Sequence, residues 1–140
     1  MQRSLGVDIE KVHDMPDMSH IAERFFSESE CKLFRALPEC QKREAFFNCW
    51  TRKEAYIKAI GDGLIMPLNS FDVTLIPGEP AKLINVPGDP ENDINWSLHE
   101  LMLPPGYIGA FAVEKGGWHL ACWQWEWDEY WEGTTSNKVV

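Results

Sequence analysis

The sequence of 140 residues lacks several features that assign a chain at once to a broad class. Its four cysteines, Cys31, Cys40, Cys49 and Cys122, show no CxxC spacing, and its histidines show no metal-ligand spacing. Its apolar runs are far shorter than the roughly 20 residues of a membrane-spanning helix. The first five residues lack the apolar run of a signal peptide. We therefore expect free thiols in a reducing cytoplasm and no membrane partner.

Basic residues are scarce in the second half of the chain. Residues 61–140 hold only 3 of the 13 Lys and Arg residues but 12 of the 22 Asp and Glu residues. They account for the whole net charge of −9, because residues 1–60 are neutral. Nucleic-acid binding is not expected, since it needs a basic domain or patch. An anionic ligand would have to be held by local lysines and a metal, because the overall field repels it.

The composition is that of a folded globular protein. The hydrophobic fraction is 44% and the aromatic fraction is 12%, which is enough for a real core in a chain of this length. We expect one domain over residues 1–132. Residues 133–140 are expected to form a flexible polar tail.

Hydrophobic periodicity in the first half predicts one strand followed by helices. The strand is expected over residues 5–10, and a short helical segment over residues 21–26. Ser27 and Glu30 have the spacing of a capping box, which predicts the start of a second helix. The longest helix is expected from about residue 41 to residue 60.

The second half has the alternation of short strands, separated by clusters of Gly, Pro and Asn. The predicted strands span residues 71–75, 81–86, 96–101, 108–113 and 118–123. Gly116 and Gly117 suggest a hairpin between the last two. A strand, then helices, then an antiparallel meander predicts an α+β fold.

The first motif that carries chemistry is Gly6-Val7-Asp8-Ile9-Glu10. Alternation on a strand puts Val7 and Ile9 on one face, and Asp8 and Glu10 on the other. Alternating charge on a half-exposed strand is common, so this motif alone is a weak signal.

The second motif is WTRKEAYIK, residues 50–58. Glu54 and Lys58 are four residues apart, so they share one face of the predicted helix. Alone, they could be an ordinary helix pair that contributes about 0.3–0.5 kcal/mol. Lys53 falls within the apolar stripe of the helix, where it either extends outward to solvent or is held for a ligand.

The two motifs together predict more than either one alone. Two carboxylates on a strand and a third from a helix can form an all-oxygen site for a hard cation such as Mg²⁺. Lysines beside such a site could hold phosphate. The residues therefore predict a metal-assisted site for a phosphorylated ligand.

The pair of motifs, residues 6–10 and 50–58, strongly resembles the two signature motifs of 4′-phosphopantetheinyl transferases. The tryptophan of the second motif and the glutamate that closes the first are closer to the surfactin-synthetase type than to the short holo-acyl-carrier-protein synthases. Residues 25–30, FFSESE, also resemble the stretch that the family has between its motifs. The resemblance covers roughly residues 5–125, and it implies a half domain in which helices pack on one side of an antiparallel sheet.

The resemblance implies Mg²⁺-dependent transfer of phosphopantetheine from coenzyme A to a serine of an acyl or peptidyl carrier protein. By motif position, Asp8, Glu10 and Glu54 would hold Mg²⁺. Lys53 and Lys58 would contact phosphate oxygens. Glu54 would be the base for the carrier serine, and Lys58 would also protonate the leaving phosphate. The segment of residues 11–24 would help to dock the carrier.

Surfactin-type enzymes have two similar halves, and this chain resembles only the C-terminal one. The chain could self-associate, be a piece of a longer protein, or be a relic without activity. We favour a homo-oligomer, dimer or trimer, whose neighbour replaces the missing half. The alternative is an inactive module of the same fold that binds the carrier or coenzyme A. The tryptophan-rich end, Trp118 to Trp131, could pack on the core or form a subunit interface. A third possible function is therefore that of an interaction protein that binds its partner through this end.

Overall fold

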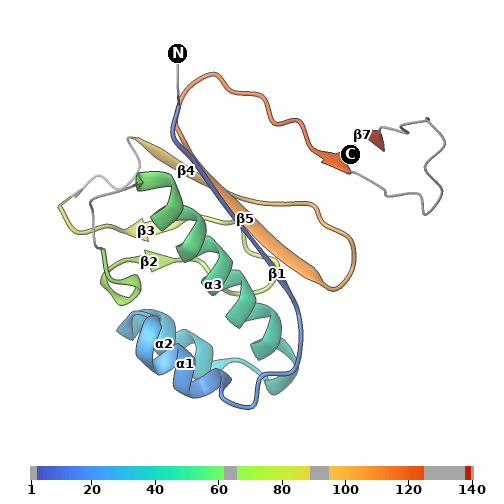
Figure 1. Cartoon of the computed structure of the whole chain (residues 1–140). Helices are drawn as coiled ribbons and strands as arrows, with labels where there is room; N and C mark the ends of the chain where they lie inside the picture. The colour runs from blue at the N-terminus through green and yellow to red at the C-terminus, as the bar shows by residue number, and fades with distance from the viewer. Residues whose placement is uncertain (1–2, 62–65, 89–94, 125–137, 140) are drawn as a thin grey trace.

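The computed structural model describes residues 3–61, 66–88, 95–124 and 138–139 (Figure 1). The elements follow one another as β1 (Leu5–Lys11), α1 (Met18–Phe25), α2 (Glu28–Ala36), α3 (Glu39–Ile60), the short 3-10 helix η1 (Leu68–Ser70), β2 (Asp72–Val73), β3 (Leu83–Asn85), β4 (Trp96–Glu100), β5 (Tyr107–Glu114), β6 (Trp123–Gln124) and β7 (Lys138–Val139). Helices in the first half and short strands in the second confirm the predicted α+β class.

The principal sheet has three antiparallel strands in the order β1-β5-β4. The central strand β5 pairs Ala110 with Asp8 of β1, and its Ala112 with Leu98 of β4. The strands β2 and β3 form a separate two-stranded sheet. The expected antiparallel meander of the second half is therefore wrong. β1 from the first half pairs with β5, and β2 and β3 pair with each other outside the principal sheet.

Helix α3 lies across one face of the principal sheet (Figure 1). Small buried residues line this contact, with Ala110 and Ala112 on β5 and Ala55 and Ala59 on α3. Short side chains let a helix approach a sheet closely. The predicted arrangement, an antiparallel sheet with helices on one side, is confirmed.

Aromatic side chains pack α1 and α2, with the residue that follows α1, against α3. Figure 1 shows the two short helices beside α3. The rings of Phe26 and Phe46 lie 5.4 Å apart, and Phe34 packs edge-on against Phe26 at 6.1 Å. The predicted capping box is also present. The Ser27 hydroxyl accepts from the Glu30 amide at 3.2 Å, and the Glu30 carboxylate accepts from the Ser27 amide at 2.8 Å.

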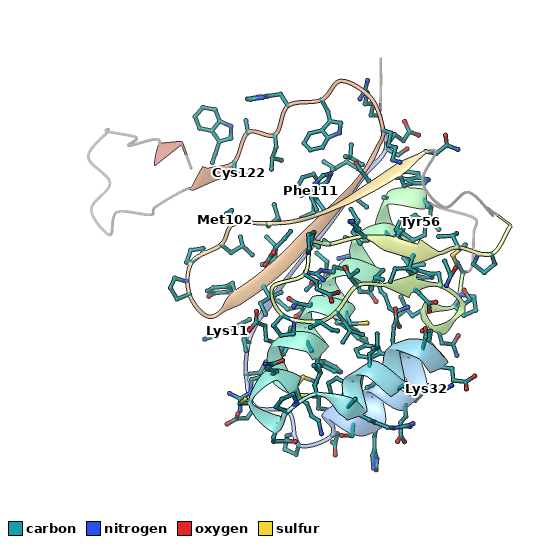
Figure 2. All side chains as sticks on the ribbon, turned by 180° about the vertical axis from the view of Figure 1, so that it is seen from behind. Lys11, Lys32, Tyr56, Met102, Phe111 and Cys122 are labelled. Carbon is teal, nitrogen blue, oxygen red and sulfur yellow. The ribbon has the colours of Figure 1, made fainter. Side chains whose placement is uncertain are left out.

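The expected strand over residues 118–123 is wrong, and so is the hairpin before it. Only Trp123 and Gln124 form a strand, which pairs with β7. Trp118 instead packs on the outer face of the sheet, 5.7 Å from the ring of Phe111 and 4.9 Å from that of His99. Figure 2 shows Phe111 on β5, on the face of the sheet against which Trp118 packs.

Several expectations concern residues that the structure does not describe. Trp125, Trp127 and Trp131 lie outside the described residues, and so does the expected domain boundary at residue 132. All four cysteines are free, as predicted. In the described part of the chain, no helix combines the length and the apolar character needed to cross a membrane.

Candidate active site

The site begins where β1 crosses α3, and Gly6 makes this crossing possible. A Cβ atom on Gly6 would lie 2.0 Å from the carbonyl oxygen of Ala55 and 2.3 Å from the amide nitrogen of Ala59. No side chain fits at such distances, so the two backbones are in direct contact. The residues that alternate with Gly6 on the same face of β1, Asp8 and Glu10, are thereby turned toward α3.

Asp8 and Lys58 join the two sequence motifs. The Lys58 ammonium donates to Asp8 Oδ1 at 2.7 Å, across a separation of 50 residues in the chain. The Asp8 side chain is buried, whereas that of Lys58 is half exposed. The second oxygen of Asp8, Oδ2, is also buried and has no hydrogen-bond partner within the described residues.

Glu54 completes an electrostatically linked group with Asp8, Glu10 and Lys58. Burial raises the pKa of Glu54 above its ordinary value, and the negative charges of Asp8 and Glu10 raise it further, against the effect of Lys58. The hydrogen bond to Asp8 raises the pKa of Lys58, which favours its charged form. The structure therefore brings together Asp8, Glu10, Glu54 and Lys58 of the predicted site.

Lys53 is the one predicted residue that the structure does not bring to this group. Its side chain is only 1% exposed, and its ammonium forms an ion pair with Glu30 at 2.9 Å. It also donates to the carbonyl oxygens of Leu68 and Phe71. These partners use all three donors of the ammonium. Of the two alternatives left open for Lys53, extension to solvent is wrong, and the placement of its ammonium among these internal partners does not suit the expected contact with phosphate.

In the described part of the chain, the carboxylates are not arranged as a complete set of metal ligands. Among the residues that the structure describes, no group of three or more His, Cys, Asp or Glu side chains is arranged to hold a metal ion. Lys58 supplies the positive charge at Asp8 Oδ1 instead. The unpartnered Oδ2 of Asp8 remains as a buried acceptor at the site.

A cavity of about 220 Å³ opens beside Glu10. His13 also lines it, and the rest of its wall is apolar: Met15, Ile21, Phe46, Phe47 and Trp50. The His13 ring lies edge-on to Phe47 at 5.6 Å. The wall comes from the end of β1, the segment after it, α1 and α3. The segment after β1 and most of α1 belong to residues 11–24, the region expected to dock the carrier.

Sequence reasoning missed the structural roles of two residues, Gly6 and Glu30. The sequence argument uses Gly6 only as part of the first motif, although a glycine within a strand is a sign of close backbone approach. Glu30 was predicted only as the partner of Ser27 in the capping box. No local signal pairs it with Lys53, because the two residues meet only in the folded chain.

Comparison with known proteins assigns the chain to a family. The model of the 4′-phosphopantetheinyl transferase superfamily matches residues 4–121. The chain therefore belongs to the 4′-phosphopantetheinyl transferase superfamily. The resemblance drawn from its two motifs is confirmed.

Two relatives illustrate the similarity in sequence. The chain is 41% identical over 123 residues to the 4′-phosphopantetheinyl transferase HetI of Nostoc sp., a match that covers 88% of this chain and 48% of that protein. It is 41% identical over 71 residues to the 4′-phosphopantetheinyl transferase Sfp of Bacillus subtilis, a match that covers 51% of this chain and 31% of that protein. The chain spans about half the length of HetI.

Solved structures share the fold. The crystal structure of holo-acyl-carrier-protein synthase from Thermotoga maritima matches with a TM-score of 0.60 at 22% identity, covering 91% of this chain and 71% of that one. The Helicobacter pylori synthase, solved in complex with coenzyme A, matches with a TM-score of 0.54 at 20% identity, covering 79% of this chain and 99% of that one.

Proposed function

We propose that this protein is a Mg²⁺-dependent 4′-phosphopantetheinyl transferase, which moves phosphopantetheine from coenzyme A to a serine of an acyl or peptidyl carrier protein. The observation that carries this proposal is the ion pair between Asp8 and Lys58, which joins the two family motifs beside Glu54. The family match and the named transferases among the relatives support the same reaction. The four free thiols suit a protein that works in the cytoplasm.

In the proposed reaction, the serine oxygen bonds to the phosphorus that carries pantetheine. The bond from that phosphorus to the bridging oxygen breaks, and 3′,5′-adenosine bisphosphate leaves. Glu54 is proposed as the base that takes the serine proton. Burial is the largest cause of its raised pKa, and a more basic carboxylate accepts a proton more readily.

Lys58 is proposed as the residue that meets the leaving phosphate. Its hydrogen bond to Asp8 raises its pKa, so it stays charged and donates hydrogen bonds at neutral pH. Its side chain is half exposed, so a ligand can approach it. A cation fixed at this point stabilises negative charge as it develops on the leaving oxygen.

Asp8, Glu10 and Glu54 would hold Mg²⁺. Two observations support this fit. The buried Oδ2 of Asp8 has no partner among the described residues. The repulsion from Asp8 and Glu10 that raises the pKa of Glu54 would also be relieved by a cation. When bound, Mg²⁺ would neutralise charge on the pyrophosphate and orient it.

The proposed assembly is a homo-oligomer, a dimer or trimer. The outer face of the edge strand β1 carries a row of exposed apolar residues: Leu5 (55% exposed), Val7 (39%) and Ile9 (49%). Apolar residues gathered on one exposed face are typical of an interaction surface. A neighbouring copy would then supply the surface that relatives of twice the length have in the same chain.

The test is transfer to a carrier protein, followed by intact mass spectrometry. The purified chain is mixed with coenzyme A, Mg²⁺ and an apo carrier protein, and each carrier is weighed. We expect a gain of one phosphopantetheine with the unaltered chain and none with Glu54→Gln. Glu44→Gln, the same substitution at an exposed position of α3, is the matched control and should keep the activity.

Failure of the unaltered chain to transfer phosphopantetheine would distinguish a transferase from a non-catalytic binding module. If coenzyme A binds but no carrier gains mass, the chain is a binding module with the transferase fold. If Glu54→Gln transfers as fast as the unaltered chain, the proposed base is wrong.

A further inference from the structure

Lys53 and Glu30 form an ion pair inside the protein, away from the proposed site. Both side chains are 1% exposed, and the Lys53 ammonium lies 2.9 Å from Glu30 Oε2. The same ammonium donates to the carbonyl oxygen of Leu68 at 2.6 Å and to that of Phe71. It also lies 4.2 Å from the centre of the Phe71 ring. Lys53 thus has a complete set of partners without any ligand.

Glu30 is equally well satisfied. Its Oε1 accepts from the backbone amide of Val73 at 2.7 Å, and its Oε2 accepts from that of Ser27 at 2.8 Å in addition to Lys53. The pair therefore connects the start of α2, the middle of α3, the first residue of η1, Phe71 after η1, and strand β2. A buried charge pair whose remaining hydrogen bonds are all made fixes the geometry of the groups around it.

The position of Lys53 on α3 relates this network to the site. Consecutive residues of an α-helix are rotated by about 100° around its axis. Lys53 and Glu54 therefore point in different directions, Lys53 toward α2 and β2, and Glu54 toward β1. Lys58 is four residues after Glu54 and shares its direction, as the contact with Asp8 confirms. Any rotation of α3 that moved Lys53 would move Glu54 and Lys58 as well.

We propose that Lys53 and Glu30 are positioning residues, which fix the rotation of α3 so that Glu54 and Lys58 face Asp8 and Glu10. Lys53 acts through the helix and does not touch the phosphates of coenzyme A. The kinetic part of this proposal rests on the transferase function proposed above. The geometric part does not, because it concerns the folded chain alone.

The test compares Glu30→Gln, Lys53→Met and the double variant in the same transfer assay. We expect each single variant to lower kcat by roughly 10- to 100-fold, since misplaced catalytic groups have effects of this size. The KM and Kd for coenzyme A should change less than about threefold, because Lys53 and Glu30 do not touch the ligand and a small misplacement affects the aligned reaction more than it affects binding. The double variant should retain more activity than the product of the two single effects, since it leaves no unpaired buried charge.

Matched controls come from the exposed pair on α2, Glu28 and Lys32, whose nitrogen and oxygen lie 3.0 Å apart. Glu28→Gln and Lys32→Met make the same chemical changes at side chains that are 87% and 70% exposed. Figure 2 shows Lys32 on α2. Both controls should leave kcat, KM and Kd unchanged.

A direct contact between Lys53 and phosphate would give a different pattern. Lys53→Met would then weaken coenzyme A binding at least tenfold while Glu30→Gln left kcat and Kd unchanged, and this result would overturn the proposal. If a single variant fails to fold, the double variant decides. Coenzyme A binding within about threefold of the unaltered chain with a lowered kcat supports positioning, and loss of binding overturns it.

A second readout keeps the proposal testable if the chain has no transferase activity. Amide chemical shifts of residues 6–10 and 54–58 report the contact between β1 and α3. Both core variants should shift these signals, and both exposed controls should not. Unchanged signals in the core variants would overturn the positioning role whatever the activity is.

Discussion

The backbone of Gly6 lies directly against that of Ala55, at the point where β1 crosses α3. This contact sets the distance between the strand that carries Asp8 and the helix that carries Glu54 and Lys58. The proposed site therefore depends on a residue that has no side chain.

Gly6→Ala should separate β1 from α3. A methyl group 2.0 Å from the Ala55 oxygen has no room, so the helix has to move. We expect a loss of about 1–3 kcal/mol in the free energy of unfolding, as for other overpacked sites, and the loss of transfer activity. Urea unfolding measures the first and the carrier assay the second.

Gly117→Ala is the matched control for this change. A Cβ atom there would have no neighbour within 4 Å. Equal stability of the two variants would contradict the close contact at Gly6.

Lys58→Met should destabilise the fold as well as abolish transfer. It removes the partner of Asp8 Oδ1, so that neither oxygen of this buried carboxylate has a hydrogen-bond partner in the described structure. We expect a loss of about 1–3 kcal/mol, the usual effect of a buried polar group left unsatisfied. Adding Asp8→Asn should restore part of it. Thermal unfolding of the two variants checks this, and an unchanged melting temperature for Lys58→Met would show that the ion pair contributes nothing.

Glu54→Gln should make the fold more stable at neutral pH while it removes activity. The pKa of Glu54 is raised above its ordinary value of 4.5, so the folded chain holds this proton more tightly than the unfolded chain does. The free energy of unfolding therefore decreases as the pH rises from 4.5 to the pKa of Glu54 in the folded chain. Above that pKa the decrease is complete and remains. Glutamine does not titrate, so the variant avoids that loss.

The expected gain at pH 7 is at most about 1 kcal/mol, because Glu54 is partly solvated and its interactions are screened. The gain should shrink as pH falls toward 4.5. Urea titrations of both chains at several pH values test this, with Glu44→Gln as the control at an exposed position of the same helix. A variant less stable than the original chain at pH 7 would contradict the raised pKa.

The buried thiols should report unfolding. Burial raises the pKa of Cys49 well above its ordinary value and also raises that of Cys31, and both side chains are buried. A thiol reagent attacks the exposed thiolate, so exposed Cys40 should react quickly in the native protein. Cys31 and Cys49 should react only as the chain unfolds. Peptide mapping after brief labelling identifies the modified residues, and fast labelling of Cys49 would contradict its burial.

Local chemistry accounts for the parts of this fold that the sequence predicts. The capping box of Ser27 and Glu30 forms within four residues, and Glu54 and Lys58 share a helix face through the period of the helix alone. The alternation of Val7, Asp8 and Ile9 is also local. All three features hold in the structure, because no distant part of the chain is needed to make them.

Tertiary packing decides the features that the sequence does not predict. Hydrophobicity alone would turn Val7 and Ile9 inward, yet these two are exposed and Asp8 is buried, because α3 packs on the Gly6 face of β1. Lys53 meets Glu30 only through the fold. The segment that begins at Trp118 has strand-like composition, but the described sheet ends at β1 and β4, and Trp118 packs on the face of that sheet instead.

The apolar row on β1 gives the last prediction. If Leu5, Val7 and Ile9 are the surface that joins copies of the chain, the unaltered protein should sediment as a dimer or trimer. Leu5→Glu should shift it toward the monomer, since burying an unpaired charge in an apolar interface is unfavourable. Ile84→Glu is the matched control, because Ile84 is 45% exposed on β3 and lies outside this row.

Activity should follow assembly if a neighbouring copy completes the site. Analytical ultracentrifugation and the transfer assay on the same samples should show that Leu5→Glu loses both properties and Ile84→Glu keeps both. Specific activity of the unaltered chain should also fall on dilution through the dissociation range. A monomer that transfers phosphopantetheine at full rate would show that the chain needs no second copy, because its own residues would then form the complete site.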